Sequence, residues 1–374
     1  MKRCKNCLMA DTKPGLVLDS DGVCQACRHY EIRQTIDYKK RFEELKKLTS
    51  RFKRDDGHYD CLIAISSGKD SHFQVYVMKE LLGMNPLLIT VRDPFTKTEA
   101  GKHNLKNICE TFGCDMISLD LNPDLVRSMV RIAFEEFGSP TWPIDRAIYV
   151  FPIKMAIRMD IPFIIYGENV SWEYGGVLDL TQEPYSAKDQ INNDVAKKVD
   201  FSLWLEHGVM QKELNMFQYP SNGEIESAKL EPIYLSYFVP WDGYHNYEIA
   251  KMYGFRDLTH EWRREGYIED YDQIDSIAYL MNVWMKYPKF GFARVTDVVG
   301  YWIRSGRISR EQGISLIKEH DHKLDQMVLD DFLKFTRYTD KEFWDVVDKF
   351  WNRDLFSKKE RLWTPNPVIS ESFK

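Results

Sequence analysis

The chain has 374 residues, of which 44% are hydrophobic and 29% charged, so it carries enough apolar material for a large core and is not expected to be disordered. A net charge of −6, from 51 Lys and Arg against 57 Asp and Glu, disfavours a protein that binds nucleic acid through its phosphates. No apolar run is long enough to cross a bilayer, and the N-terminal segment lacks the apolar core of a signal peptide. We therefore expect a cytoplasmic protein with no membrane contact and two domains, or one with large additions.

Four of the seven cysteines form two matched pairs near the N-terminus. Cys4 and Cys7 make one CxxC motif, Cys24 and Cys27 make the second, and 16 residues separate the two. This spacing is typical of a tetrahedral zinc site, and the Pro-Gly and Asp-Gly turns between the motifs favour a small hairpin that brings them together. Four sulfur ligands leave no open position for water, so residues 1–35 are expected to fold around a structural zinc ion. The remaining cysteines are expected to pack as small apolar residues: Cys61, Cys109 and Cys114.

Residues 36–58 predict a basic linker helix. The stretch from Lys39 to Arg54 reads KKRFEELKKLTSRFKR, and its apolar residues fall on one helical face. We expect that face to pack on the following domain while the basic face stays in solvent. An RNA-docking patch is the alternative interpretation.

From residue 59 to residue 235 the pattern alternates between strands and helices. Short apolar runs predict strands at residues 59–67, 85–93, 114–121 and 161–169. Helices are predicted at residues 70–83, 98–113 and 123–137, followed by a helical stretch that Pro152 interrupts. Strands without polar alternation, separated by helices, indicate an α/β fold with a parallel sheet covered by helices on both faces. Ligands of such sheets lie at the carboxyl ends of the strands.

A loop suited to anions stands where the first predicted strand gives way to a helix. It reads Ser66-Ser67-Gly68-Lys69-Asp70-Ser71, with small residues that let an anion approach the backbone and hydroxyl groups that can donate to it. The Walker A spacing and the GxGxxG fingerprint are both absent. Asp70 is also a candidate N-cap for the helix that follows.

This loop resembles the SGGxDS loop of the N-type ATP pyrophosphatases, the PP-loop enzymes with an adenine nucleotide alpha-hydrolase-like fold. The first glycine of that pattern is Ser67 here, which is strained if the position needs a positive φ and otherwise offers one more phosphate donor. The resemblance implies that the loop binds ATP, that Lys69 and Mg²⁺ neutralise the leaving pyrophosphate, and that Asp70 meets the metal. In such relatives the end of the second strand, here Thr90 to Arg92, lies against adenine.

A second group of polar residues follows the fourth predicted strand. Gly167, Glu168 and Asn169 stand directly after it, and Glu173 comes soon afterwards. A carboxylate and an amide at the end of an apolar strand are poorly explained by packing. We expect these residues at the nucleotide site, with Glu168 as a second magnesium ligand and Glu173 orienting or deprotonating a nucleophile.

Longer motifs extend the resemblance to most of the chain. The cysteine pairs, SxGKDS and IPFIIYGENVSWEYGG are followed by YFVPWD at residues 237–242, YPKFGFARVTD at residues 287–297 and IRSGRISRE at residues 303–311. In this order they resemble the bacterial N-acetyl sugar amidotransferases. The resemblance implies that the acetamido group of a nucleotide-linked sugar is adenylated and then converted by ammonia to an acetamidino group, for lipopolysaccharide O-antigen or flagellin glycans. It also implies partner subunits, similar to a glutaminase and a cyclase, that deliver the ammonia.

Residues 236–374 are then expected to form a mostly helical region that binds substrate or partner. Four charged residues there are candidates for contacts with the nucleotide sugar: Arg294, Asp297, Arg304 and Arg307. Two other functions stay open. A tRNA-thiolating PP-loop enzyme could share the zinc site and the loop, although it needs a reactive cysteine near the loop and the acidic charge disfavours tRNA. The second alternative is a non-catalytic scaffold protein, in which the intact loop would have no function.

Overall fold

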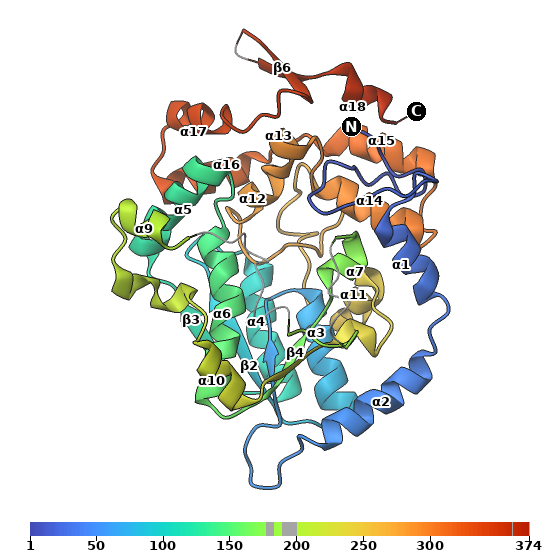
Figure 1. Cartoon of the computed structure of the whole chain (residues 1–374), viewed down its shortest axis with the longest axis vertical. Coiled ribbons are helices and arrows are strands. Elements are labelled where there is room, and N and C mark those ends of the chain that lie inside the picture. Colours follow the sequence, from blue (N-terminus) through green and yellow to red (C-terminus); the bar gives the residue numbers. More distant parts are fainter. Residues whose placement is uncertain (177–182, 189–199, 361, 374) are drawn as a thin grey trace.

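The structure is a computed structural model that describes residues 1–176, 183–188, 200–360 and 362–373 (Figure 1). At its centre lies a five-stranded sheet in the order β3-β2-β1-β4-β5, in which every neighbouring pair is parallel. The strands are β1 (Cys61–Ala64), β2 (Pro86–Arg92), β3 (Met116–Asp120), β4 (Phe163–Tyr166) and β5 (Glu231–Tyr234). The four predicted strands are confirmed. The sequence prediction lacks β5, because four residues with Pro232 among them give little strand signal.

Helices cover both faces of the sheet, as predicted. Ile63 and Ile165 face one side, where they pack with residues of α2 (Tyr38–Ser50), α3 (Lys69–Val75) and α4 (Glu99–Phe112). Leu62 and Ile164 alternate with them and pack against α6 (Trp142–Arg158) on the other side. Because neighbouring strand residues point to opposite faces, the uniformly apolar strands require this double cover.

The basic linker helix corresponds to α2. Leu45, Leu48 and Thr49 are buried, and Phe42 and Phe52 pack against the same apolar cluster. The expected packing of the apolar stripe on the domain is therefore confirmed. The polar face of the helix carries exposed ion pairs such as Lys46 with Glu43.

Local signals fix most helix ends around the sheet. The side chain of Thr98 caps α4 and Gly113 ends it in the left-handed region, while α5 (Pro123–Phe137) has the predicted bounds. The helix after the loop continues from α3 into a π-helical turn, η1 (Tyr76–Leu81), before Gly83. The expected interruption at Pro152 is wrong, because α6 runs through it. Proline at this position removes the helical hydrogen bond to the carbonyl of Ile148, a residue that is exposed.

The N-terminal hairpin and the C-terminal region pack together. Antiparallel bridges join Arg3 to Ala10 and Leu18 to Cys24, and the hairpin leads into α1 (Gln25–Arg33). Leu8 packs with residues of two C-terminal helices, α14 (Arg294–Arg304) and α15 (Arg310–His320). Figure 1 accordingly draws the blue N-terminal segment beside the orange α14 and α15.

The C-terminal region is mostly helical, as expected. Its other elements are α11 (Gly243–Met252), α12 (Leu280–Trp284), α13 (Lys286–Phe290), α16 (Gln326–Thr336), α17 (Asp340–Val347), α18 (Pro367–Glu371) and a hairpin of β6 (Phe356–Lys359) and β7 (Leu362–Pro365). Short helical elements between β4 and α11 are α7 (Val170–Tyr174), α9 (Ser202–Glu206), η2 (Gln211–Phe217), α10 (Asn222–Ala228) and η3 (Leu235–Tyr237). In the described part of the chain, no helix is both long enough and apolar enough to span a bilayer.

Substitution of Gly138 would test how tightly α5 packs on the C-terminal region. It ends α5 with a φ of +59°, and a Cβ there would lie 2.9 Å from the Phe350 ring, whereas Gly306 has a φ of +73° and open space around it. We predict that Gly306→Ala lowers the free energy of unfolding by about 1–2 kcal/mol through backbone strain alone. Gly138→Ala should cost about 1–3 kcal/mol more, because it also overpacks the ring. Urea unfolding checks both, and equal losses would contradict the packing argument.

Candidate functional site

A cavity of about 800 Å³ opens at the carboxyl ends of β1, β2 and β4. Eight of the predicted site residues line it: Ser66, Ser67, Asp70, Ser71, Thr90, Arg92, Gly167 and Glu168. The structure therefore brings the loop after β1, the end of β2 and the residues after β4 into one site, where parallel sheets hold their ligands. The other predicted residues lie outside its wall: Gly68, Lys69, Asn169, Glu173, Arg294, Asp297, Arg304 and Arg307.

The loop between β1 and α3 is held by its own side chains and by one distant carboxylate. Ser66 N donates to Ser71 Oγ at 2.8 Å, and Gly68 N donates to Ser66 Oγ at 3.1 Å. The amide and hydroxyl of Ser67 both donate to Asp275 Oδ1, at 2.7 and 2.6 Å. Ser67 does not have a positive φ. Serine therefore carries no strain at this position, and its hydroxyl is used to bind Asp275.

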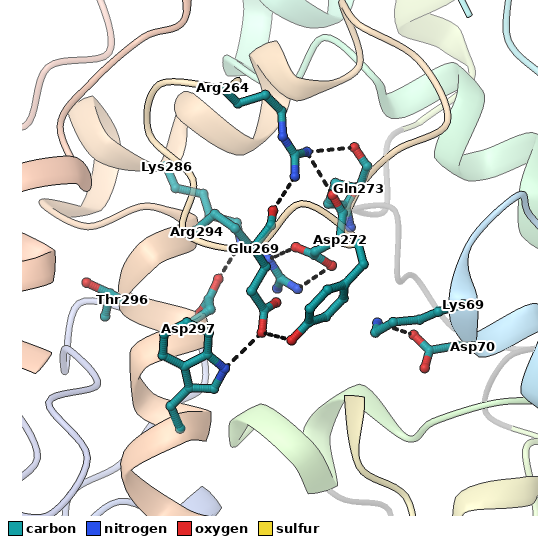
Figure 2. A network of polar contacts seen from close by, with 12 residues as sticks. Lys69, Asp70, Arg264, Glu269, Asp272, Gln273, Lys286, Arg294, Thr296 and Asp297 are labelled. Carbon is teal, nitrogen blue, oxygen red and sulfur yellow. Dashed lines mark hydrogen bonds and ion pairs between the residues drawn. The ribbon is translucent and has the colours of Figure 1, made fainter. Parts of the chain in front are cut away.

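Lys69, which is buried, forms an ion pair with the partly exposed Asp70 at the start of α3 (Figure 2). Lys69 Nζ donates to Asp70 Oδ2 at 2.8 Å, and Asn246 Nδ2 donates to Asp70 Oδ1 at 2.7 Å. Burial by itself would lower the pKa of Lys69, but Asp70 and Asp272 outweigh it and raise that pKa above its ordinary value. Lys69 therefore stays a cation next to the loop.

Glu168 is the carboxylate of the cavity with the most perturbed protonation. Burial, followed by the nearby negative charges of Asp70 and Glu173, raises the pKa of Glu168 to about 8. Its side chain makes no hydrogen bond or ion pair with any residue that the structure describes. Two carboxyl groups close enough for one to raise the pKa of the other would gain from a cation between them, and carboxylate oxygens are the donors that Mg²⁺ prefers.

Asn169 and Glu173, which follow Glu168, both stabilise α7 and its surroundings. Asn169 Oδ1 accepts from the amides of Ser171 and Trp172, at 3.1 and 3.3 Å, and so caps α7. Glu173 is buried and paired with the buried guanidinium of Arg33 on α1. Glu173 is thus turned toward the N-terminal unit and away from the cavity.

The end of β2 supplies one buried and one exposed group. Thr90 is buried in the cavity wall. Arg92 reaches the wall from the surface and makes two hydrogen bonds to Asp120, at 2.8 and 2.6 Å. Its guanidinium is therefore shared with β3 in this structure.

The four predicted sugar contacts are all held by partners inside the protein. Arg294 makes a two-pronged pair with Asp272, at 2.6 and 2.9 Å, and Lys286 donates to Asp297 at 2.9 Å (Figure 2). Arg304 Nη2 donates to the carbonyl of Glu173 at 3.1 Å, and Arg307 pairs with Asp242. Arg294 and Arg304 thus connect α14 to residues that lie outside the cavity wall. Contact of these four residues with a sugar stays a prediction.

Part of the cavity wall comes from a segment that contains no predicted site residue. Gln273, Asp275, Ser276 and Tyr279 line the cavity from the loop before α12. Hydrogen bonds hold this loop on the residues after β2, for example Ile277 N to Thr96 O at 2.9 Å. It lacks periodicity, so no sequence signal marks it. Gln74 could have been predicted as a cavity residue, because it lies one helical turn after Asp70 and on the same face of α3.

The two CxxC motifs meet in a buried cluster. Cys4 Sγ lies 3.8 Å from Cys27 Sγ, Cys7 Sγ lies 3.5 Å from Cys24 Sγ, and all four sulfurs lie within 4.8 Å of one another. A tetrahedral ion with metal–sulfur bonds of about 2.3 Å would separate the sulfurs by about 3.8 Å. The cluster therefore has the donor set and the spacing of a four-sulfur metal site.

Comparison with known proteins assigns the C-terminal part. Residues 244–367 match the family model described as LPS biosynthesis protein WbpG-like, C-terminal domain. An uncharacterized protein from Methanocaldococcus jannaschii is 22% identical over 197 residues, which cover 50% of this chain and 69% of that protein. The cavity-lining loop at residues 273–279 thus lies inside the WbpG-like domain.

Two solved structures share a weaker likeness. NMN synthetase from Francisella tularensis has 11% identity and a TM-score of 0.28, covering 61% of this chain and 100% of that chain. The U34-tRNA thiolase NcsA from Methanococcus maripaludis, with its [4Fe-4S] cluster, has 14% identity and a TM-score of 0.30, covering 87% and 90%.

The raised pKa of Glu168 predicts a pH-dependent cost to stability. In the unfolded chain this carboxyl loses its proton near its ordinary pKa, whereas the folded chain keeps the proton up to about pH 8. The contribution of Glu168 to stability therefore falls as pH rises between these two values and stays low above the second. Glu168→Gln should melt higher than the parent chain without added metal, with a gap that widens from pH 5 to pH 8. Thermal unfolding across this range checks it, and a constant gap would contradict it.

Proposed function

We propose that this chain is an ATP-dependent N-acetyl sugar amidotransferase, which converts the acetamido group of a nucleotide-linked sugar to an acetamidino group. The observation that carries the proposal is the composition of the cavity. Its wall combines the serines and Asp70 of the SxGKDS loop, together with Glu168, with a loop of the WbpG-like domain, whose family description is lipopolysaccharide biosynthesis. An activating site for a nucleotide and a domain typical of surface-sugar synthesis would thus share one cavity.

The chemistry starts from a poor electrophile. An amide carbonyl does not lose its oxygen until that oxygen is converted to a leaving group, so the carbonyl oxygen attacks the α-phosphorus of ATP and pyrophosphate departs. Lys69, held as a cation beside the loop, would neutralise charge on the departing pyrophosphate. Asp70 and Glu168 would hold Mg²⁺, which supplies further neutralisation of the phosphates when bound.

The second step forms the amidine. The nitrogen of ammonia attacks the carbon of the adenylated amide, the carbon–oxygen bond to AMP breaks, and the amidine keeps the extra proton as a cation. The buried, partly negative cavity around Asp70 and Glu168 would favour this cationic product. Glu173 is occupied by Arg33, so we assign it to positioning of α7 and not to proton transfer.

Nitrogen supply would come from partner subunits, one similar to a glutaminase and one similar to a cyclase. A glutaminase uses a thiolate, and burial raises the pKa of Cys61 and Cys109 above the ordinary thiol value and that of Cys114 to about 11. These three thiols are therefore poor nucleophiles. The same argument weakens the alternative of a tRNA-thiolating enzyme, although Cys109 does reach the cavity wall.

Zinc is the metal we propose for the four-cysteine cluster. Four thiolates on two CxxC motifs are its usual structural ligands, and the complete sulfur shell leaves no position for substrate. Its role would be to fold the hairpin that carries α1 and hence Arg33.

The reaction is tested by incubating the chain with ATP, Mg²⁺, ammonium chloride and UDP-linked N-acetylhexosamines. We predict AMP and pyrophosphate as products and a sugar whose mass reflects exchange of oxygen for an NH group. Asp70→Ala should lower turnover by about two to three orders of magnitude, because it removes charge stabilisation at the loop. Glutamine should replace ammonium only after a glutaminase is added. ADP and phosphate as the main products would rule out the proposed chemistry.

The metal proposal is tested by elemental analysis of the purified chain. We expect one zinc ion per chain, and its loss in both Cys24→Ser and Cys27→Ser, with weakened folding of the N-terminal unit because structural zinc contributes about 10 kcal/mol or more in small modules. Cys61→Ser, which changes a buried cysteine outside the cluster, is the matched control and should keep its zinc. Unchanged zinc in the first two variants would exclude the assignment.

A further inference from the structure

One polar side chain in the cavity wall lacks a partner. Gln74, on α3, has only 5% of its surface exposed and lines the cavity. Its Oε1 atom makes no hydrogen bond within the described residues. A buried acceptor without a donor is destabilising in the folded chain, and a ligand that brings an N–H group to this part of the cavity wall would supply the donor.

Gln74 lies next to Trp241, and both side chains pack closely against the backbone of Gly167. A Cβ at Gly167 would lie 2.9 Å from Gln74 Nε2 and 2.9 Å from Cη2 of Trp241. Trp241 lines the same cavity with 4% of its surface exposed and packs on Phe73 with the rings at 74°. Glycine at position 167 thus leaves a primary amide and an indole side by side, directly before Glu168.

The order of the sheet separates this group from the predicted adenine position. Thr90 and Arg92 lie at the end of β2, on one side of β1, whereas Gly167 follows β4 on the other side. A nucleotide with its base at β2 and its phosphates at the loop after β1 leaves the β4 side for the second substrate. That side is where Gln74 and Trp241 stand.

We infer that Gln74 and Trp241 form the subsite for the acetamido group of the acceptor. The N–H of the acetamido group donates to Gln74 Oε1, and its methyl group packs on Trp241. A hydroxyl group at the same sugar carbon would bring no methyl group, and an O-acetyl ester would bring no N–H donor, so the pair selects for an N-acetyl group. This inference rests on the proposed function, because it assigns a subsite to the proposed acceptor.

Binding of nucleotide sugars tests the subsite apart from turnover. The probes are UDP-N-acetylglucosamine and UDP-glucose, which differ at the acetamido position, titrated calorimetrically into chain holding Mg²⁺ and α,β-methylene-ATP. We expect the parent chain to prefer the N-acetyl sugar by about tenfold or more, from one buried hydrogen bond and one packed methyl group. Gln74→Met, which keeps the volume, should reduce the preference to about twofold or less. Gln34→Met, at an exposed position, should leave it unchanged.

The possible results are distinguishable. Undiminished preference in Gln74→Met would overturn the subsite and leave the proposed function standing. Weaker binding of α,β-methylene-ATP in that variant, with the sugar preference intact, would assign Gln74 to the nucleotide and also overturn it. Failure of the parent chain to bind or modify any N-acetyl nucleotide sugar, while it still cleaves ATP to AMP, would reject the acceptor class and the subsite with it.

Discussion

Buried charge beside the loop after β1 has to be compensated, and this requirement ties the sheet to the C-terminal region. Lys69 is buried, and a buried ammonium group is stable only near carboxylates, which Asp70 supplies directly and Asp272 supplies from the C-terminal region. Asp272 is in turn held by the two-pronged pair with Arg294. One cation at the sheet therefore requires two segments of the WbpG-like domain to be folded against it.

A second buried pair extends this arrangement to the N-terminus. Arg33 reaches Glu173 from the helix that follows the cysteine hairpin, and Arg304 donates to the carbonyl of the same glutamate from α14. The short helix after β4 is thus fixed from two directions. The hairpin and α1 also reach α7 through Lys13, whose Nζ donates to the carbonyl of Tyr174 at 2.7 Å, and through His29, which stacks on Trp172. Loss of a metal from the hairpin is therefore expected to disturb folding around α7 more than the chemistry of the loop.

The sequence predicts what is decided locally and misses what depends on distant partners. Asn122, Pro123 and Gly138 are sufficient to set both ends of α5, and uniform apolar runs are sufficient to identify four strands. The pairing of Glu173 with Arg33, 140 positions apart, has no local signal, so its sequence-based role in proton transfer rested on position alone. The unpaired Oε1 of Gln74 is likewise a property of the folded cavity.

Ser67, in the loop after β1, is held by a residue that is distant in the sequence. Glycine at that position in the PP-loop pattern leaves an amide alone, whereas Ser67 adds a hydroxyl, and both groups are taken by Asp275. Asp275 comes from the WbpG-like domain, so the altered loop and the added domain are matched to each other. A carboxylate in this place repels a polyphosphate unless a cation lies between them. Under the proposed function, entry of the nucleotide into the cavity would therefore depend on its accompanying metal ion.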